Sequence, residues 1–200
     1  MPKRRLDQVL VVDVEATCWD GPAPEGQESE IIEIGLCLLD VATATRLERR
    51  NILVRPERSS VSAFCTQLTT LTQEQVEQGT SFAEACSLLQ QEYASTERVW
   101  ASYGEYDRQQ FERQCQARQI AYPFGRHLNV KLLLGLVFAL PREVGMAEAL
   151  RLLRVPLEGT HHRGGDDAWN IAGILAELLK RSRGSVSFST SAGSAKSEGT

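Results

Sequence analysis

Two carboxylates interrupt a run that otherwise has the pattern of a buried β-strand. The run is LVVDVEATCW at residues 10–19, and its acids are Asp13 and Glu15. Residues two apart in a strand point to the same face, roughly 7 Å apart at a rise of about 3.3–3.4 Å per residue. Buried charges are unfavourable unless paired, and this spacing suits two divalent cations about 3.5–4 Å apart. The two acids therefore predict half of a metal site.

Further candidate ligands lie at the starts of two later helical segments. Asp107 follows the apolar segment VWAS and opens a polar helix, and Asp167 opens the last helix. Either acid could instead be a favourable charge or an N-cap at a helix N-terminus. Asp167 precedes Ile171 by one helical turn, so it lies at the top of the stripe that should face the sheet. His162 lies five residues before Asp167, in a Gly-rich stretch.

The segments that must position these residues read as strands first and then as strands alternating with helices. Apolar alternation and runs of β-branched residues predict strands at 8–14, 30–40, 46–56, 97–102 and 127–131. Helical spacing of apolar residues predicts helices at 81–94, 104–119, 132–140, 145–153 and 166–181. Residues 59–80 are expected to be irregular. The short links favour an antiparallel meander of the first three strands in an α/β domain with a mixed sheet.

The composition is that of one globular domain with a tail. Of 200 residues, 42% are apolar and 24% are charged, and no apolar run is long enough to span a membrane. Residues 182–200 are rich in Ser, Gly and Thr, which predicts a disordered tail after a domain at 1–181. The N-terminus lacks the apolar core of a secretory signal, and five scattered cysteines without a CxxC pair favour the cytoplasm. A net charge of −4 lacks the dominant basic footprint of many nucleic-acid-binding proteins.

The order of the acids and the histidine resembles the DEDDh branch of the 3′–5′ exonuclease superfamily, which includes ribonuclease T and the proofreading subunit of bacterial replicative polymerase. The pattern is Asp-x-Glu in the first strand, Asp opening a middle helix and His-x4-Asp opening the last helix. Several segments are similar to the branch that contains the histone-mRNA and small-RNA exonucleases and the KapD-like proteins. They are VDVEATCW, SEIIEIG, FCTQLTTLTQEQV, SYGEYDRQQF, LNVK and HRGGDDAWNIA, and the resemblance covers about residues 6–180.

The resemblance implies a ribonuclease H-like mixed five-stranded sheet flanked by helices. It also implies metal-dependent release of nucleoside 5′-monophosphates from the 3′ end of single-stranded RNA or DNA, with RNA favoured. The residues that would hold two Mg²⁺ or Mn²⁺ ions are Asp13, Glu15, Asp107 and Asp167. His162 would be the general base, and Glu15 would also take part in catalysis. The His-x4-Asp spacing favours His162 over His161, and Asp167 over Asp166.

Candidate contacts for the terminal nucleotide lie after the metal-binding strand and in three other segments. The residues directly after the acids are placed to hold the terminal sugar and base. By resemblance, part of the FCTQLTTLT segment would pack against the last base. Packing under a loop is an equal alternative for its apolar residues. The candidates are Ala16, Thr17, Cys18, Trp19, Phe64, Leu68, Thr69, Tyr103, Tyr106 and Asn129.

Two alternative functions stay open beside the general exonuclease. One is an exoribonuclease that acts only on short oligonucleotides, which the sequence hardly separates from the first. The other is a catalytically silent nucleic-acid-binding regulator on the same fold. A silent protein would normally have lost an acid or the histidine, and all five positions are present here.

Overall fold

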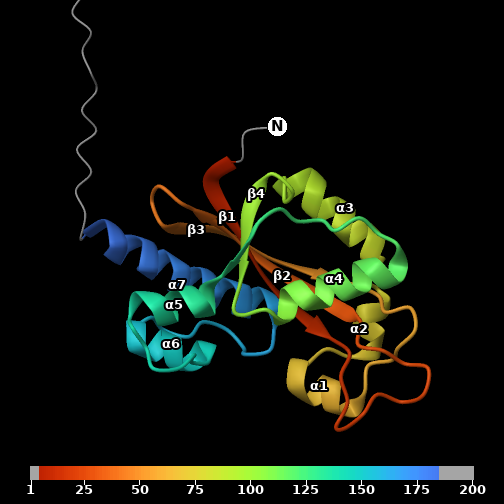
Figure 1. Ribbon diagram of the computed structural model, residues 1–200. Coiled ribbons are helices and arrows are strands. Elements are labelled where there is room, and N and C mark those ends of the chain that lie inside the picture. Colours follow the sequence, from red (N-terminus) through yellow and green to blue (C-terminus); the bar gives the residue numbers. More distant parts are fainter. Residues whose placement is uncertain (1–4, 185–200) are drawn as a thin grey trace, which may run out of the picture.

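A mixed five-stranded sheet forms the centre of the protein, seen in a computed structural model that describes residues 5–184 (Figure 1). The strands are β1 Arg5–Ala16, β2 Ile31–Asp40, β3 Thr45–Leu53, β4 Arg98–Ser102 and β5 His127–Asn129. Their order in the sheet is β3-β2-β1-β4-β5. The β1, β2 and β3 strands pair antiparallel, whereas β4 is parallel to β1 and β5 is parallel to β4. The expected meander and the expected mixed sheet are both confirmed.

Helices cover both faces of this sheet. They are α1 Ala63–Thr69, α2 Gln73–Glu77, α3 Phe82–Tyr93, α4 Tyr106–Arg118, α5 Val130–Val137, α6 Met146–Leu153 and α7 Gly164–Gly184. The longer helices α3 to α7 lie where the periodicity predicts them. Within residues 5–184, none of the helices combines the length and the apolar character that a bilayer span requires.

The prediction of an irregular segment at 59–80 is wrong, because α1 and α2 lie there. Side-chain caps begin both helices. The Ser62 hydroxyl accepts a hydrogen bond from the Cys65 backbone N–H, and Thr72 forms a capping box with Gln75. Each cap satisfies backbone donors that a short helix otherwise leaves unpaired. The Thr-x-x-Gln spacing was a readable signal within the Thr-rich segment.

The last helix is longer than predicted at both ends. It begins at Gly164 and ends at Gly184, so residues 182–184 of the predicted tail are helical. The rest of that tail, residues 185–200, lies outside the described part of the chain.

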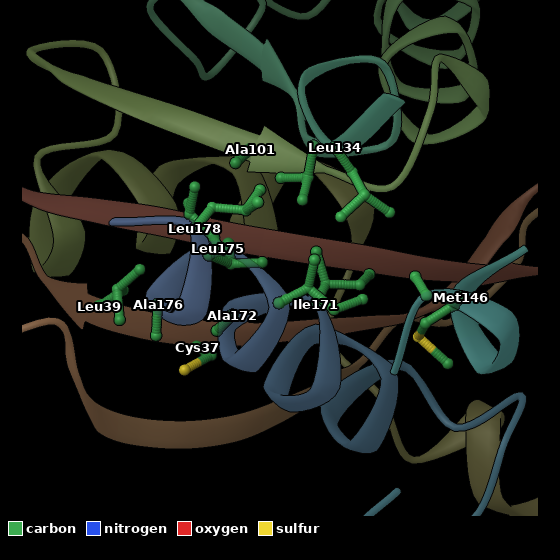
Figure 2. Close-up of a cluster of buried hydrophobic side chains, with 14 of the residues drawn as sticks. Cys37, Leu39, Ala101, Leu134, Met146, Ile171, Ala172, Leu175, Ala176 and Leu178 are labelled. Atoms are coloured by element: carbon green, nitrogen blue, oxygen red, sulfur yellow. The ribbon is translucent and has the colours of Figure 1, made fainter. Parts of the chain in front are cut away.

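Alternation along β1 gives the sheet two apolar faces. Leu10, Val12 and Val14 pack toward α3 and α4 in a cluster that includes Trp100 and Phe111. The intervening Val9 and Val11 face the other way, toward α5, α6 and α7. Figure 2 shows part of this second cluster, in which Ile171, Ala172, Leu175 and Leu178 of α7 lie among Cys37, Leu39, Ala101 and Leu134. The face covered by α7 is therefore the face on which the next odd-numbered residues of β1 must project.

A close approach of two backbones fixes where α7 begins. Gly35 of β2 lies opposite Asp13 of β1 in the sheet. A Cβ atom at Gly35 would lie 1.7 Å from the carbonyl carbon of Gly164, which no side chain could tolerate. Glycine at this position therefore lets the N-terminus of α7 pack directly on the sheet, beside the acidic end of β1.

Candidate active site

Three of the predicted acids meet where β1 passes beneath the start of α7. Asp13 and Glu15 continue the face of Val9 and Val11, but they lie beyond the apolar contacts with α7. Asp167 approaches from the first turn of α7. One oxygen from each of the three carboxylates lies within 4.8 Å of the other two. Strand periodicity and the position of α7 thus place three negative groups around one point.

Asp107 joins the same pocket because β1 is longer than its neighbour. Pairing between β1 and β4 ends at Val11 and Ala101, which leaves the later N–H groups of β1 without a strand partner on that side. The Val14 N–H donates to Asp107 Oδ1 at 2.9 Å, and Asp107 is buried in the first turn of α4. A pocket of about 380 Å³ is lined by all four acids.

Crowding of the acids raises their pKa values. Burial, followed by the charge of Asp107, raises the pKa of Asp13 well above its ordinary value. Burial and the neighbouring Asp167 raise the pKa of Glu15 to about 8. Burial also raises the pKa of Asp107 to about 6, outweighing the hydrogen bond from Val14. The cluster is therefore unfavourable in its fully ionised form unless a cation neutralises it.

We expect the protein in EDTA to lose stability as the pH rises from about 4 to about 8. Because the folded pKa values of Glu15 and Asp107 exceed the unfolded values of about 4, the folded state binds more protons than the unfolded state over this range. Their stabilisation is complete below about pH 4 and is lost as the pH passes about 6 and then about 8. The loss should be on the order of a few kcal/mol.

Scanning calorimetry between pH 5 and 9 measures this effect as a falling Tm. Mg²⁺ or Mn²⁺ should restore the Tm at the alkaline end, and the Glu15→Gln variant should show a flatter profile in EDTA. A Tm in EDTA that rises over this range would contradict the assigned pKa shifts.

The two oxygens of Asp167 have different surroundings. Oδ2 lies 2.9 Å from His161 Nδ1 and accepts the backbone N–H of His162 at 2.8 Å. Oδ1 is buried and, among the described residues, has no hydrogen-bond partner. An orphaned carboxylate oxygen beside other carboxylates fits a hard divalent cation, which prefers oxygen ligands. The residues present are therefore suited to Mg²⁺ or Mn²⁺.

Both histidines of the HHRGG segment line the pocket. Their rings stack with centroids 4.0 Å apart and an interplanar angle of 11°. Burial and the neighbouring His161 lower the pKa of His162, which favours the neutral imidazole that a general base requires. Because both rings line the pocket, the choice between His161 and His162 as the base stays a prediction from the spacing.

Asp166 and Asp167 occupy distinct environments despite being adjacent. Asp166 accepts the Thr160 N–H at 2.7 Å and pairs with Arg49 of β3 at 3.0 Å. It does not line the pocket, whereas Asp167 does. Asp166 therefore holds the segment before α7 against the sheet, and Asp167 is the acid available at the pocket.

Glu33 is a charged residue at this site that the sequence reasoning missed. It lies opposite Glu15 in the β1–β2 register and is completely buried. Its carboxylate accepts from Arg163 Nη2 at 2.9 Å and from the Gly164 N–H at 2.8 Å. The Arg163 guanidinium balances the charge of the Glu33 carboxylate, and the two bonds together anchor the N-terminus of α7. Only the strand register could have placed this acid beside Glu15.

Half of the predicted nucleotide contacts line the pocket, namely Ala16, Cys18, Leu68, Tyr103 and Tyr106. Tyr106 is 57% exposed and Leu68 is 37% exposed, so both offer apolar surface to a ligand. Met146 of α6 also lines the pocket, although its sequence context carries no signal for such a role.

The other predicted contacts are not in the pocket lining. Thr17 is buried, with its N–H donated to the Glu30 carbonyl and its hydroxyl to the Glu28 carbonyl. Thr69 is buried and donates its hydroxyl to the Cys65 carbonyl. Asn129 caps α5 and donates to Glu105. The polar groups of these three residues already have partners within the protein, and their contacts with a nucleotide stay predictions. Trp19 and Phe64 also lie outside the pocket lining, and their two contacts stay predictions.

The chain is similar to known proteins in sequence and in fold. The sequence profile of the exonuclease family of the ribonuclease T type matches residues 10–175. Human 3′-5′ exoribonuclease 1 is 30% identical over 186 residues, which cover 87% of this chain and 53% of the relative. The chain thus spans about half the length of that relative.

Two solved structures have the same fold and similar sequences. The nuclease domain of 3′hExo, a DEDDh family member bound to rAMP, superposes with a TM-score of 0.80 at 29% identity, covering 88% of this chain and 92% of that one. A 3′-exonuclease in a study of 3′-end recognition of the histone mRNA stem-loop gives a TM-score of 0.76 at 28% identity, covering 88% and 82%. The expected ribonuclease H-like sheet is thereby confirmed.

Proposed function

Because this chain belongs to the exonuclease family, we propose that it is a metal-dependent 3′–5′ exonuclease that releases nucleoside 5′-monophosphates, with RNA as the favoured substrate. The observation that carries the proposal is the convergence of Asp13, Glu15, Asp107 and Asp167 in one pocket. These acids come from three separate elements, and one buried oxygen of Asp167 has no hydrogen-bond donor among the described residues. A purely structural role would leave this group of carboxylates unexplained.

The four acids are proposed to hold two Mg²⁺ or Mn²⁺ ions. Asp13 would be a ligand in this set, since the charges of Asp107, Glu15 and Asp167 all act on its carboxylate. When bound, such ions lower the pKa of a water nucleophile and stabilise the leaving 3′ oxygen. The fixed β1 backbone and the Val14–Asp107 hydrogen bond keep the ligands in place before metal arrives.

His162 is proposed to accept the proton from the attacking water. Its half-buried ring lines the pocket, and its lowered pKa keeps it neutral near neutral pH. A general base of this kind contributes typically about 10²–10⁴-fold to the rate. Glu15 is proposed to act beside it, as a metal ligand whose carboxylate also orients the water.

The preference for RNA is supported by the relatives, which are named as exoribonucleases or were solved with rAMP. Leu68 and Tyr106 provide the apolar and aromatic surface on which a terminal base would pack, without selecting the base. Ala16, Cys18 and Tyr103 complete the proposed binding surface. We also propose the cytoplasm as the location, because all five cysteines are free thiols.

Two alternatives predict different results. A silent regulator would bind nucleic acid without cleaving it, although all five motif residues line the pocket. An oligonucleotide-only enzyme would cleave chains of a few nucleotides and leave long ones intact.

Digestion of 5′-labelled single- and double-stranded RNA and DNA in Mg²⁺ tests the proposal. We expect a ladder that shortens from the 3′ end, fastest with single-stranded RNA, no products in EDTA, and recovery with Mg²⁺ or Mn²⁺. Activity that persists in the chelator would exclude the two-ion assignment. Binding without cleavage would support the regulator, and cleavage limited to the shortest RNAs would support the oligonucleotide enzyme.

A further inference from the structure

The tandem histidines before α7 make a second set of possible metal ligands. One ligand atom each from His161, His162 and Asp167 lies within 4.8 Å of the other two. We propose that these three residues bind a transition-metal ion of the Zn²⁺ class, and that this ion blocks the Mg²⁺-dependent site. The binding is independent of catalysis, whereas the blocking effect rests on the proposed function.

The backbone turns two neighbouring side chains to the same side. Successive side chains in an extended segment point in opposite directions. His162 instead has a φ of +64°, in the left-handed region that non-glycine residues seldom adopt. The two imidazole rings consequently stack at 4.0 Å and both line the pocket. Such uncommon backbone conformations are concentrated at functional sites.

The spacing of one pair of donor atoms is close to that of two ligands of one metal ion. His161 Nδ1 lies 2.9 Å from Asp167 Oδ2. Two ligands of a tetrahedral ion with bonds of about 2.0–2.1 Å lie roughly 3.3 Å apart, so these two atoms need to move by only a few tenths of an ångström. His161 has 46% of its side chain exposed, which gives an ion a route from solvent. The His161–Asp167 pair therefore needs only a small adjustment to bind, whereas the His162 ring, which is stacked nearly parallel on His161, must rotate to direct a nitrogen at the same ion.

The segment that carries the histidines is held in place on both sides. Asp166 accepts a hydrogen bond from the N–H of Thr160, which directly precedes the two histidines, and forms an ion pair with Arg49 of β3. Arg163, directly after the pair, is bound by the buried Glu33. Little further ordering is then needed when an ion binds, which favours affinity.

The chemistry of the two ligand sets predicts different metals. Two imidazoles and one carboxylate, with a water as fourth ligand, suit Zn²⁺, Co²⁺ or Ni²⁺. The neighbouring set of Asp13, Glu15 and Asp167 offers only oxygens and suits Mg²⁺ or Mn²⁺. Asp167 belongs to both sets. Zn²⁺ bound to the histidines would also occupy the proposed general base. It should therefore compete with the binding of Mg²⁺ or Mn²⁺ that hydrolysis requires.

Calorimetric titration with Zn²⁺ tests the site without reference to activity. The Asp13→Asn variant, which disables the oxygen-rich set, should still bind one Zn²⁺ per chain. Adding His161→Ala or His161→Asn should weaken that binding at least tenfold, whereas adding Thr160→Ala, an exposed neighbour in the same loop, should not. Co²⁺ in place of Zn²⁺ should give the visible absorption of a tetrahedral site, and lose it with His161→Ala. The proposal is overturned if Zn²⁺ does not bind, or binds equally well without His161.

Inhibition is measured separately, with each variant compared with its own rate in Mg²⁺. Zn²⁺ should inhibit the wild-type protein, and His161→Ala should need at least tenfold more Zn²⁺ for the same fractional loss. Equal sensitivity of the two proteins would overturn the blocking role. If neither the wild-type protein nor the His161→Ala variant hydrolyses RNA in Mg²⁺, the proposed function fails. The calorimetric result still decides whether the zinc site exists.

Discussion

Replacing Asp13 by asparagine is expected to reduce the rate of hydrolysis at least 10³-fold, which corresponds to about 4 kcal/mol of lost transition-state stabilisation. Asp13 lies among the carboxylates of Glu15, Asp107 and Asp167, so its loss removes the charge that two cations would share. Asparagine keeps the shape of the side chain. We therefore expect kcat to fall without loss of the fold, as measured by initial rates on labelled RNA and by circular dichroism.

The stability of the same variant separates this effect from unfolding. In EDTA at pH 9, Asp13→Asn should have a Tm at least as high as that of the wild-type protein, because it removes a poorly solvated negative charge. The matched control is Asp20→Asn, which neutralises an acid in the exposed loop after β1 and should leave the rate unchanged. Wild-type turnover by Asp13→Asn would exclude the metal assignment.

Replacing His162 by alanine should reduce kcat about 10²–10⁴-fold with little change in KM, the effect of losing a general base. The imidazole lines the pocket, and its lowered pKa leaves it unprotonated at neutral pH. Single-turnover rates on short RNA measure the chemical step directly. The pH dependence of those rates should also lose the limb that His162 contributes in the wild-type protein.

The adjacent histidine provides a matched comparison. His161→Ala removes the same side chain one residue away, where the ring contacts Asp167 through Nδ1. Its loss in kcat should be clearly smaller than that of His162→Ala. The reverse order would show that His161 is the base, and that the His-x4-Asp spacing identifies the wrong residue.

Local patterns predicted most of the fold because they have short-range causes. Strand alternation and helical periodicity placed the five strands and the helices α3 to α7. The same patterns missed α1 and α2, where few apolar residues recur and hydroxyl caps start the helices. Capping depends on single side chains and leaves no apolar periodicity. A Thr-rich segment that contains such caps therefore resembled an irregular one.

The sequence by itself determined which residues are candidates for the chemistry. The two-residue period of β1 put Asp13 and Glu15 on one face, and the stripe of α7 put Asp167 above that face. Only the tertiary structure decided what lies around them. The β1–β2 register brings Glu33 beside Glu15, and the close contact of Gly35 with Gly164 sets how near the start of α7 lies to the sheet. The backbone at His162 brings a ligand atom of each histidine within 4.8 Å of an Asp167 oxygen. Periodicity acts within one element, whereas register, backbone contact and the partners of Thr17 or Asn129 depend on residues far apart in the chain.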